Sequence, residues 1–383
     1  MPDLVALDLP PGPAFVTQLR KAWDAGDAVL PVDQRLPAAA KASLLAALAP
    51  SVVIGPGGGR TGWPHGQPME SGDAVVVATS GSTGPPKGVI LTHDALSAHA
   101  RAVHDRLEVD PARHRWLACL PVAHVGGFGV ITRALITGTP LDVLEAFDAA
   151  MVAVWGEAHR GRGLVSLVPT ALDRVDPAPF RWVVLGGSSD PTAASRPGNV
   201  IHTYGLTESG GGVVYDGFPL AGVEVRVVDG EIQLRGAPLL RAYRDGTDPK
   251  SADGWLVTGD VGSLDPGTGS LTVEGRAGEL IVTGGENVWP TAVEAVLGQH
   301  PDIDEVAVAG RPDAQWGHRV VAWIVTKPRS RPPTLDQLRG FAKQHLPAHA
   351  APRELILVDQ LPRTPLGKIH RAALTQPPDD PGA

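Results

Sequence analysis

Residues 79–88 read Thr-Ser-Gly-Ser-Thr-Gly-Pro-Pro-Lys-Gly, and they lie between two apolar runs at 74–78 and 89–91. The apolar runs predict buried strands, and Thr92 predicts the cap of a following helix. Because the small side chains leave the backbone N–H groups exposed, the loop can surround an anion, with hydroxyl groups and Lys87 as further donors. The stretch therefore indicates a strand–loop–strand clamp for a nucleoside triphosphate, with a mobile surface loop as the alternative.

The same loop departs from the common pattern of P-loop proteins. That pattern places Gly directly before its Lys and Ser or Thr directly after it. Here Pro86 precedes Lys87 and Gly88 follows it. The stretch is therefore not a Walker A element, and its assignment depends on the rest of the chain.

The composition limits the class of protein. The chain has 383 residues, 43% of them apolar, which is enough for two or three domains with a core. Its formal net charge is −8 and it has no basic run, which argues against nucleic acid or an anionic membrane as the main partner. Cys119 is the only cysteine, so we expect no internal disulfide, a buried inert thiol and a cytoplasmic location. We expect no signal peptide and no membrane-spanning segment.

Apolar periodicity predicts alternating helices and strands before residue 190. The predicted helices cover residues 14–25, 36–49, 93–107, 124–137 and 148–158. The predicted strands cover residues 51–54, 116–121, 141–144, 164–168 and 182–186. This alternation is typical of a layered α/β domain with a largely parallel sheet.

From residue 220 the pattern changes to short alternating runs with a turn at Asp229-Gly230, which predicts an antiparallel β subdomain. Further along, the predicted elements are strand 279–283, helix 290–299, strands 304–309 and 319–326, helix 334–345 and strand 354–358. We therefore expect an α/β protein with a large N-terminal domain over residues 1–275 and a small, mobile α+β domain over residues 276–383. The Pro- and Asp-rich tail from Gln376 is predicted to be disordered.

Three further motifs carry polar groups suited to a nucleotide. In residues 204–209, Tyr-Gly-Leu-Thr-Glu-Ser, a Tyr at a strand end can stack on a purine, while Thr207 and Glu208 offer oxygen ligands for Mg²⁺. In Thr-Gly-Asp at 258–260, a carboxylate held at a strand end by a Gly turn can accept both hydroxyl groups of a ribose. Lys368 lies on a loop stiffened by Pro and Gly. Each motif alone has a simpler explanation: a turn with a packed tyrosine, a common Asp-Gly turn and a solvated surface lysine.

Together the motifs resemble those of the acyl-adenylate-forming superfamily, which includes acyl-CoA synthetases, adenylation domains of peptide synthetases and luciferases. The phosphate loop, the Tyr-Gly-x-Thr-Glu block, Thr-Gly-Asp, Gly275-Arg276 and Pro-x-Thr-x-x-Gly-Lys occur in the family's order over roughly residues 73–371. The resemblance implies that a carboxylic acid is adenylated with ATP and Mg²⁺ and that the acyl group then passes to a thiol such as coenzyme A.

The resemblance also implies a role for each matching position. The residues that would cradle the β- and γ-phosphates are Thr79, Ser80, Gly81, Ser82, Thr83, Gly84 and Lys87. Those that would border the adenine and the acyl pocket are Gly186, Gly187, Ser188, Tyr204 and Gly205. Thr207 and Glu208 would hold phosphate and Mg²⁺, while Asp260 and Arg276 would hold the ribose. Lys368 would bridge the reacting carboxylate and the α-phosphate, where a cation between two anions offsets their repulsion.

The same resemblance implies a gate and a domain movement. His124 matches the family's aromatic or His gate beside the acyl site, with a buried histidine at a helix start as the structural alternative. The small domain would close to deliver Lys368 and then rotate, so that residues 284–287 open a channel for the thiol. The family's hinge residue is usually Asp or Lys, whereas this chain has Gly278, which absorbs backbone rotation easily.

Softer features resemble the o-succinylbenzoate–CoA ligases of menaquinone biosynthesis. They are a short region before the phosphate loop, Gly-Gly-Glu-Asn-Val-Trp-Pro at 284–290, and Ser-Leu-Val-Pro-Thr at 166–170. The implied reaction converts 2-succinylbenzoate, ATP and CoA into 2-succinylbenzoyl-CoA, AMP and diphosphate. The second carboxylate of that acid requires a cation or oriented donors, for which Arg133 and Ser209 are candidates.

Three alternatives remain open from the sequence. They are another acyl- or aryl-CoA ligase, a stand-alone adenylation enzyme that loads a carrier protein, and a catalytically inactive nucleotide-binding regulator. The presence of Lys87, Glu208 and Lys368 argues against the last of these. Homo-oligomers are common in the family, which implies a homo-oligomer here.

Overall fold

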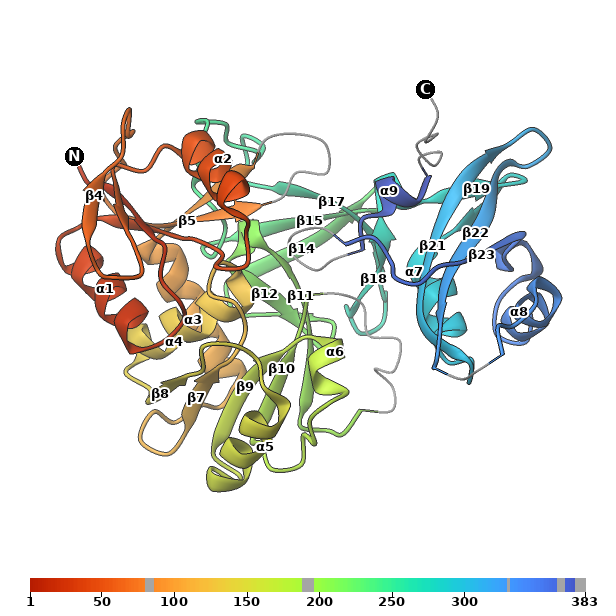
Figure 1. The fold of residues 1–383 in the computed structure, drawn as a ribbon, viewed down its shortest axis with the longest axis horizontal. Coiled ribbons are helices and arrows are strands. Elements are labelled where there is room, and N and C mark those ends of the chain that lie inside the picture. Colours follow the sequence, from red (N-terminus) through yellow and green to blue (C-terminus); the bar gives the residue numbers. More distant parts are fainter. Residues whose placement is uncertain (80–85, 188–195, 329–330, 364–368, 376–383) are drawn as a thin grey trace.

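The chain forms a large N-terminal part and a smaller C-terminal part (Figure 1). The structure, a computed structural model, describes residues 1–79, 86–187, 196–328, 331–363 and 369–375. Within these ranges, three sheets belong to the large part and one to the small part. This arrangement confirms the predicted α/β class with a second, smaller α+β domain.

The strands that flank the phosphate loop belong to a mixed seven-stranded sheet with the order β16-β6-β5-β2-β1-β3-β4. The strands are β1 (Leu4–Leu7), β2 (Ala28–Pro31), β3 (Val52–Ile54), β4 (Arg60–Gly62), β5 (Asp73–Thr79), β6 (Lys87–Thr92) and β16 (Ala242–Tyr243). β1, β2, β3 and β5 run parallel, while β4, β6 and β16 each pair antiparallel with a neighbour. The two strands around the loop therefore pair with each other, and a much later segment completes the edge beside β6.

The second seven-stranded sheet has the order β13-β12-β11-β10-β9-β7-β8. Its strands are β7 (Arg115–Ala118), β8 (Leu141–Val143), β9 (Gly163–Leu167), β10 (Trp182–Leu185), β11 (Val200–Leu206), β12 (Gly211–Tyr215) and β13 (Phe218–Pro219). The strands from β7 to β11 are parallel, as predicted, and only β12 and β13 are antiparallel.

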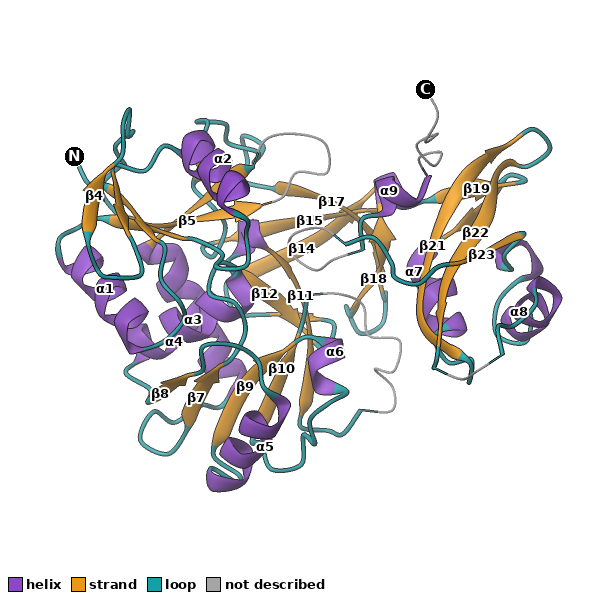
Figure 2. Cartoon of the chain, viewed as in Figure 1, coloured by secondary structure: helices purple, strands orange, loops and turns teal. Residues whose placement is uncertain are grey.

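The helices α3 and α4 lie between these two sheets (Figure 2). The helices of the large part are α1 (Pro13–Asp24), α2 (Ala38–Leu48), α3 (His93–Leu107), α4 (Val125–Thr137), α5 (Ala149–Ala158) and α6 (Pro169–Leu172). α3 packs against β5 and β6, and α4 packs against β7 and β9, so one hydrophobic core joins both sheets. The Thr92 hydroxyl accepts a hydrogen bond of 3.1 Å from the Ala95 N–H, which confirms the predicted cap of α3.

The rest of the large part is an antiparallel sheet of β14 (Val223–Val228), β15 (Glu231–Gly236), β17 (Leu256–Leu264) and β18 (Leu271–Arg276). The predicted hairpin turn at Asp229-Gly230 is confirmed, and both residues have positive φ, 50° and 81°. Short 3₁₀ turns are η2 (Thr207–Ser209), η3 (Ala277–Glu279) and η4 (Ala348–Ala350).

The C-terminal part packs helices on one sheet around a core of its own. Its strands are β19 (Ile281–Thr283), β20 (Glu286–Val288), β21 (Ile303–Asp313), β22 (Gly317–Thr326) and β23 (Glu354–Leu357). Its helices are α7 (Pro290–Leu297), α8 (Leu335–Ala342) and α9 (Arg371–Thr375). The predicted disordered tail lies outside the described residues.

Two predictions about strand ends are wrong. Tyr204 lies inside β11, which continues to Leu206 because β12 folds back and pairs with it. Asp260 lies inside β17 rather than in a turn at its end. Opposite it the pairing of β15 with β17 shifts register, so the Thr-Gly-Asp residues form an irregular stretch of a continuing strand, where Gly259 has φ +73°.

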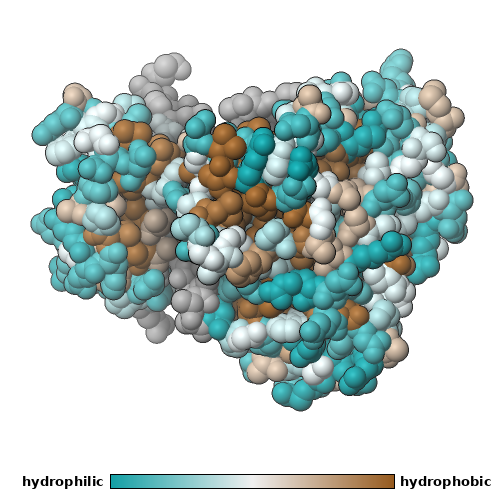
Figure 3. All heavy atoms as spheres, turned by 180° about the vertical axis from the view of Figure 1, so that it is seen from behind, coloured by the Kyte–Doolittle hydropathy of each residue, from teal (hydrophilic) through white to brown (hydrophobic). Residues whose placement is uncertain are grey.

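The single cysteine is buried, as predicted. Burial raises the pKa of the Cys119 thiol to about 12, so the thiol is unreactive at neutral pH. Among the helices that the structure describes, none is long and apolar enough to cross a membrane. Figure 3 shows hydrophilic side chains over the margins of one face of the molecule and hydrophobic ones towards its middle.

Candidate active site

Three predicted site residues from three strands meet at one carboxylate. Asp260 of β17 lies opposite Arg276 of β18 in the strand register, and its Oδ1 lies 2.9 Å from Arg276 Nε. The Tyr204 hydroxyl of β11 donates a hydrogen bond of 2.8 Å to the other carboxylate oxygen, Oδ2. Asp260 is buried, whereas about half of the Arg276 side chain is exposed. The cluster therefore combines a fixed carboxylate with an accessible guanidinium, which suits the hydroxyl groups of a ribose.

The local chain conformation fixes this carboxylate. The Thr258 hydroxyl accepts a hydrogen bond of 3.0 Å from the Asp260 N–H and donates one of 2.7 Å to the Ile232 carbonyl of the neighbouring strand. Burial, followed by the negative charge of Asp260, raises the pKa of the Tyr204 hydroxyl. Tyr204 therefore remains a hydrogen-bond donor at neutral pH.

A second set of predicted residues gathers where the phosphate loop begins and ends. Thr79 is paired with Lys87 across β5 and β6, and its hydroxyl lies 3.4 Å from the Lys87 carbonyl oxygen. The Lys87 Nζ lies 5.1 Å from the centre of the Tyr243 ring, and the Tyr243 hydroxyl donates a hydrogen bond of 3.0 Å to Glu208 Oε1. The structure thus brings together the lysine and the carboxylate predicted to hold the triphosphate and Mg²⁺. Sequence reasoning missed Tyr243, because no local signal marks it.

The oxygen donors at Glu208 suit Mg²⁺, which takes only part of its ligands from the protein, better than they suit a metal ion coordinated by protein side chains alone. Across the described ranges, no group of three or more His, Cys, Asp or Glu residues could hold a metal ion. Mg²⁺ typically binds one or two carboxylates, keeps several waters and takes phosphate oxygens of the substrate. Glu208 and the adjacent Thr207 carry oxygen donors of the kind that such a site takes from the protein.

Glycines in the predicted motifs allow strands to approach each other closely. A Cβ on Gly205 would lie 1.9 Å from the Gly211 carbonyl oxygen of β12, so only glycine fits there. Gly187 has φ +96°, a conformation that other residues rarely adopt. The predicted residues that lie outside the described ranges are Ser80, Gly81, Ser82, Thr83, Gly84, Ser188 and Lys368.

His124 lies at the start of α4, held by two residues that follow β2. Arg35 Nη2 lies 3.1 Å from His124 Nε2, and Asp33 Oδ2 lies 3.5 Å from the same nitrogen. Burial alone would raise the pKa of the Asp33 carboxyl, but hydrogen bonds from His124 and Arg35 outweigh it and hold the pKa well below its usual range. Asp33 is therefore charged at neutral pH and anchors Arg35 through both carboxylate oxygens. The sequence does not predict the Asp33–Arg35 pair, because the residue it contacts, His124, is far away in the chain.

Ser209 and Arg133, the two candidates for binding a second carboxylate of the substrate, differ in whether their polar atoms already have hydrogen-bond partners. Ser209 is fully buried, and its hydroxyl bonds to the backbone of Leu206 and Gly211, so it is fully engaged in its own turn. Arg133 is also buried, with its guanidinium 4.7 Å from the Trp116 ring. In the part of the chain that the structure describes, its Nε and Nη1 have no hydrogen-bond partner. A Cβ on Gly129, one turn earlier on α4, would lie 3.8 Å from Arg133 Nη2 and 3.7 Å from the Gly210 carbonyl oxygen.

Comparison with known proteins identifies the kind of enzyme that has this arrangement. Residues 60–289 match the AMP-binding enzyme family, and residues 292–368 match the AMP-binding enzyme C-terminal domain. The chain is 42% identical over 332 residues to a probable 2-succinylbenzoate–CoA ligase of Mycobacterium tuberculosis, with 81% of this chain and 86% of the relative covered. It is 32% identical over 334 residues to a 2-succinylbenzoate–CoA ligase of Listeria monocytogenes, with 79% and 70% covered.

Solved structures show the same fold. An o-succinylbenzoate CoA synthetase from Bacillus subtilis in complex with its acyl-adenylate intermediate matches with a TM-score of 0.87 at 24% identity, over 98% of this chain and 88% of that one. ATP-bound MatB from Rhodopseudomonas palustris matches with a TM-score of 0.83 at 22% identity, over the same shares. With the family models covering both parts of the chain and the site residues in their expected order, this chain belongs to the AMP-binding enzyme family.

Proposed function

We propose that the chain is an ATP-dependent acid–CoA ligase that converts 2-succinylbenzoate into 2-succinylbenzoyl-CoA, with release of AMP and diphosphate. The curated relatives named for this reaction are 42% and 32% identical to it over most of both chains. Within the molecule, the observation that carries the choice of acid is the buried guanidinium of Arg133.

The first step joins the acid to AMP. The nucleotide is held by Asp260 and Arg276 at its ribose and by Thr79 to Lys87 at its β- and γ-phosphates. Thr207 and Glu208 would hold Mg²⁺, which would neutralise charge on the triphosphate and on the departing diphosphate. We assign Lys368 to the position between the acid carboxylate and the α-phosphate, where its point charge would offset their repulsion while the oxygen attacks phosphorus. Residues 276–383, which carry Lys368, close over residues 1–275 for this step.

The second step transfers the acyl group to the CoA thiol. The acyl-adenylate is a mixed anhydride, so the sulfur attacks the carbonyl carbon and AMP leaves. On this proposal His124 is the gate between the acyl pocket and the thiol channel, and the Asp33–Arg35 pair contacts its ring. Gly278 in η3 has a φ outside the left-handed region and open space around its Cβ, so the position accepts the small domain's rotation without a steric conflict.

Arg133 accounts for an acid with two carboxylates. A buried guanidinium whose Nε and Nη1 lack hydrogen-bond partners among the described residues is costly, and an anionic group that enters its site relieves this cost. Arg133 lies on α4 beside Gly129 and the Gly210 carbonyl oxygen, and His124 precedes the first residue of the same helix. The reacting carboxylate goes to Lys368 and the second carboxylate goes to Arg133. Benzoate and fatty acids lack the second anion and are poor substrates on this proposal.

The test is product analysis with a panel of acids. The enzyme is incubated with ATP, Mg²⁺, CoA and each acid, and AMP and thioester are measured by mass spectrometry. A 2-succinylbenzoyl-CoA product with benzoate and fatty acids inert supports the proposal. Turnover of a different acid keeps the chemistry and rejects the substrate. AMP without a CoA thioester indicates a carrier-protein acceptor, and no AMP with any acid rejects the enzymatic function.

We also propose a cytoplasmic, homo-oligomeric enzyme. The cytoplasmic location is supported by the single buried cysteine, since oxidising compartments favour disulfides. The homo-oligomer is supported only by the frequency of homo-oligomers in the family that the sequence resembles. Light scattering of the purified chain tests it.

A further inference from the structure

Tyr243 contacts both of the groups predicted to hold the triphosphate and its Mg²⁺. Its hydroxyl donates to Glu208 Oε1 at 3.0 Å, and its ring centre lies 5.1 Å from Lys87 Nζ. These three residues come from segments far apart in the sequence: the start of β6, the turn η2, and β16. None of the motifs in the sequence analysis includes Tyr243. Its position next to Glu208 and Lys87 therefore follows from the fold and not from a local sequence pattern.

Strand register explains why the ring faces Lys87. β16 pairs antiparallel with β6 so that Tyr243 lies opposite Val89. Lys87 is two residues from Val89, so its side chain is on the same face and diagonal to the tyrosine, within reach of a long side chain. The backbone of the same segment also reaches η2, where the Leu240 N–H donates to the Glu208 carbonyl oxygen at 2.7 Å. The tyrosine is therefore held next to both partners by main-chain hydrogen bonds.

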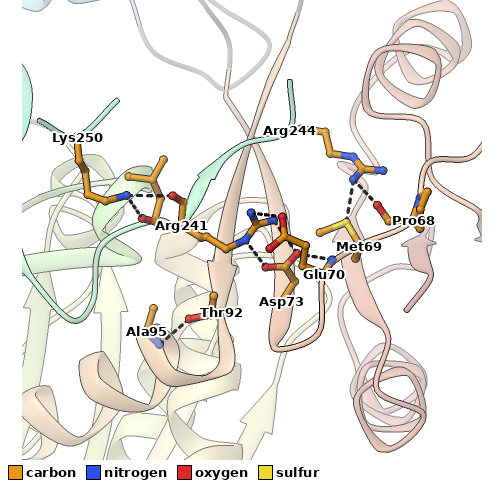
Figure 4. Close-up of polar contacts among 10 residues, drawn as sticks. Pro68, Met69, Glu70, Asp73, Thr92, Ala95, Arg241, Arg244 and Lys250 are labelled. Carbon is orange, nitrogen blue, oxygen red and sulfur yellow. Dashed lines mark hydrogen bonds and ion pairs between the residues drawn. The ribbon is translucent and has the colours of Figure 1, made fainter. Parts of the chain in front are cut away.

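Charged side chains on both sides fasten this short strand to the sheet (Figure 4). Arg241 donates to both carboxylate oxygens of the buried Asp73, at 2.8 and 2.9 Å, and to Glu70 at 2.7 Å. Arg244 donates to backbone carbonyls of the segment before β5. Lys250 donates to the Leu240 and Arg241 carbonyls at 2.7 and 3.0 Å. A strand of only two residues thus has a fixed position, which a positioning role requires.

We propose that Tyr243 is a positioning residue for nucleotide binding, which orients the Glu208 carboxylate for Mg²⁺ and supports the Lys87 ammonium beneath the triphosphate. The proposal rests on the proposed function and assigns a role that the family match does not supply. By donating to Oε1, the hydroxyl fixes the plane of the carboxylate, so that its remaining lone pairs face the metal. The ring face attracts the ammonium and limits its rotamers.

The geometry of this hydrogen bond gives the Tyr243 hydroxyl the donor's role, with Glu208 Oε1 3.0 Å away as the acceptor. Glu208 in its charged form can only accept hydrogen bonds, so the direction of the bond is fixed. A charge-assisted bond of this kind is stronger than a neutral one, and its loss would leave Glu208 free to rotate.

The test separates the hydroxyl from the ring. Tyr243→Phe keeps the ring and removes the bond to Glu208, and Tyr243→Ala removes both. ATP binding is measured by calorimetry at a series of MgCl₂ concentrations, and diphosphate release is measured with the acid. For Tyr243→Phe we expect the Mg²⁺ concentration at half-maximal ATP binding to rise about tenfold. For Tyr243→Ala we expect a further loss of about two- to fivefold in ATP affinity at saturating Mg²⁺.

A second half-reaction distinguishes positioning from a general loss of structure. Conversion of supplied acyl-adenylate and CoA into thioester needs neither Mg²⁺ nor a triphosphate, so both variants should match the wild type there. In a Glu208→Ala background, adding Tyr243→Phe should change the Mg²⁺ dependence no further, because the residue acts through that carboxylate. Glu224→Gln, which removes a glutamate bonded to Arg235 on a distant strand pair, is the matched control and should behave as wild type.

Two results would overturn the inference. One is an unchanged Mg²⁺ dependence of ATP binding in Tyr243→Phe. The other is an equal loss of both half-reactions together with a lower melting temperature, which would make Tyr243 a residue of the fold only. Failure of the proposed function looks different, because then the wild type itself would bind no Mg²⁺·ATP or release no diphosphate with any acid.

Discussion

At the scale of single residues, the role proposed for Arg133 predicts which acids the enzyme accepts. Arg133→Met keeps most of the side-chain volume and removes the buried charge. We expect kcat/KM for 2-succinylbenzoate to fall about a hundredfold, because the second carboxylate loses its buried partner. The activity with the ester that masks this carboxylate should fall much less or rise. Steady-state thioester formation with both acids is the measurement, and an equal loss for both would rule out Arg133 as the receptor.

His99 gives the stability of the fold a pH dependence that can be assigned to one side chain. Burial, followed by the charge of Arg133, lowers the pKa of His99 from about 6.5 to about 4, while its Nε2 lies 2.9 Å from the Gly212 carbonyl oxygen. Between these values the unfolded chain binds a proton that the folded chain does not. The free energy of unfolding should therefore fall as the pH drops from about 6.5 to about 4, by up to about 3 kcal/mol from this group.

Urea unfolding at several pH values measures that slope. His99→Gln keeps a donor for the Gly212 carbonyl but does not titrate, so its slope should be clearly flatter over the same range. A slope identical to that of the wild type would assign the pH dependence to other groups. Among these, His104 is the one most similar to His99. Burial lowers the pKa of His104 to about 4 as well.

The sequence predicts the residues of the candidate site better than it predicts the neighbouring residues that contact and position them. Tyr204, Asp260 and Arg276 stand in recognisable motifs, and the structure brings them together. Asp33 and Arg35, which contact His124, stand in no motif. Their contact with His124 joins positions 89 residues apart for Arg35, and no local pattern reports a partner at that distance. The roles given to the motif residues stay predictions for the experiments above.

At the scale of secondary structure, the β11–β12 hairpin is the element on which the site depends. Gly205→Ala would place a Cβ 1.9 Å from the Gly211 carbonyl oxygen, so β12 would have to move away from β11. We expect a loss of about 1 to 3 kcal/mol in stability and a larger loss in ATP binding, because Tyr204 and η2 belong to this hairpin. Thermal melting and calorimetry measure the two effects.

Gly198→Ala is the matched control for that substitution. It lies just before the same strand, its φ is not in the left-handed region, and its Cβ would have open space around it. We expect it to leave melting and ATP binding unchanged. If Gly205→Ala behaved in the same way, the close approach of the two strands would not matter to the site.

Elements with strong periodicity are those that the sequence predicts well. The helix expected at 93–107 is α3 with the same bounds, and the run at 164–168 is β9. The sequence predicts no strand at β4, because its three exposed residues Arg60–Gly62 carry no apolar signal. β16 has only two residues, so pairing with β6 rather than its own sequence makes it a strand. Tertiary contacts decide such short elements, and local patterns cannot report them.

At the scale of the whole molecule, the proposed reaction needs both parts of the chain in different arrangements. Lys368→Ala should lower adenylation by about a hundred- to a thousandfold, because it removes the cation between two reacting anions. The same variant should still convert supplied acyl-adenylate and CoA into thioester at the wild-type rate. Diphosphate release and thioester formation are measured separately, and an equal loss in both would contradict the role given to this lysine.

The two parts meet through a tryptophan that both the sequence and the structure single out. Trp289, from the motif that resembles the succinylbenzoate ligases, donates a hydrogen bond of 3.0 Å to Glu274 Oε2 of β18 and packs against Gly275. Within the small part, Arg371 of α9 pairs with Glu279 of η3 at 3.1 Å and with Glu294 at 2.8 Å. The contacts of Trp289 cross to β18, so a rotation of the small part about Gly278 must change them.

The late arrival of β16 at the sheet edge has a consequence for how the protein is made. On the ribosome, β5 and β6 emerge early, whereas the strand that covers β6 and carries Tyr243 emerges only after the whole second sheet has been synthesised. Until then the nascent chain presents an open, apolar edge at Val89–Leu91, the kind of edge that invites wrong pairing. ATP cannot stabilise the early intermediate, because Glu208 and Tyr243 do not yet exist. Nascent chains stalled before residue 242 should therefore depend on chaperones, and those long enough for β16 to have left the ribosome should not.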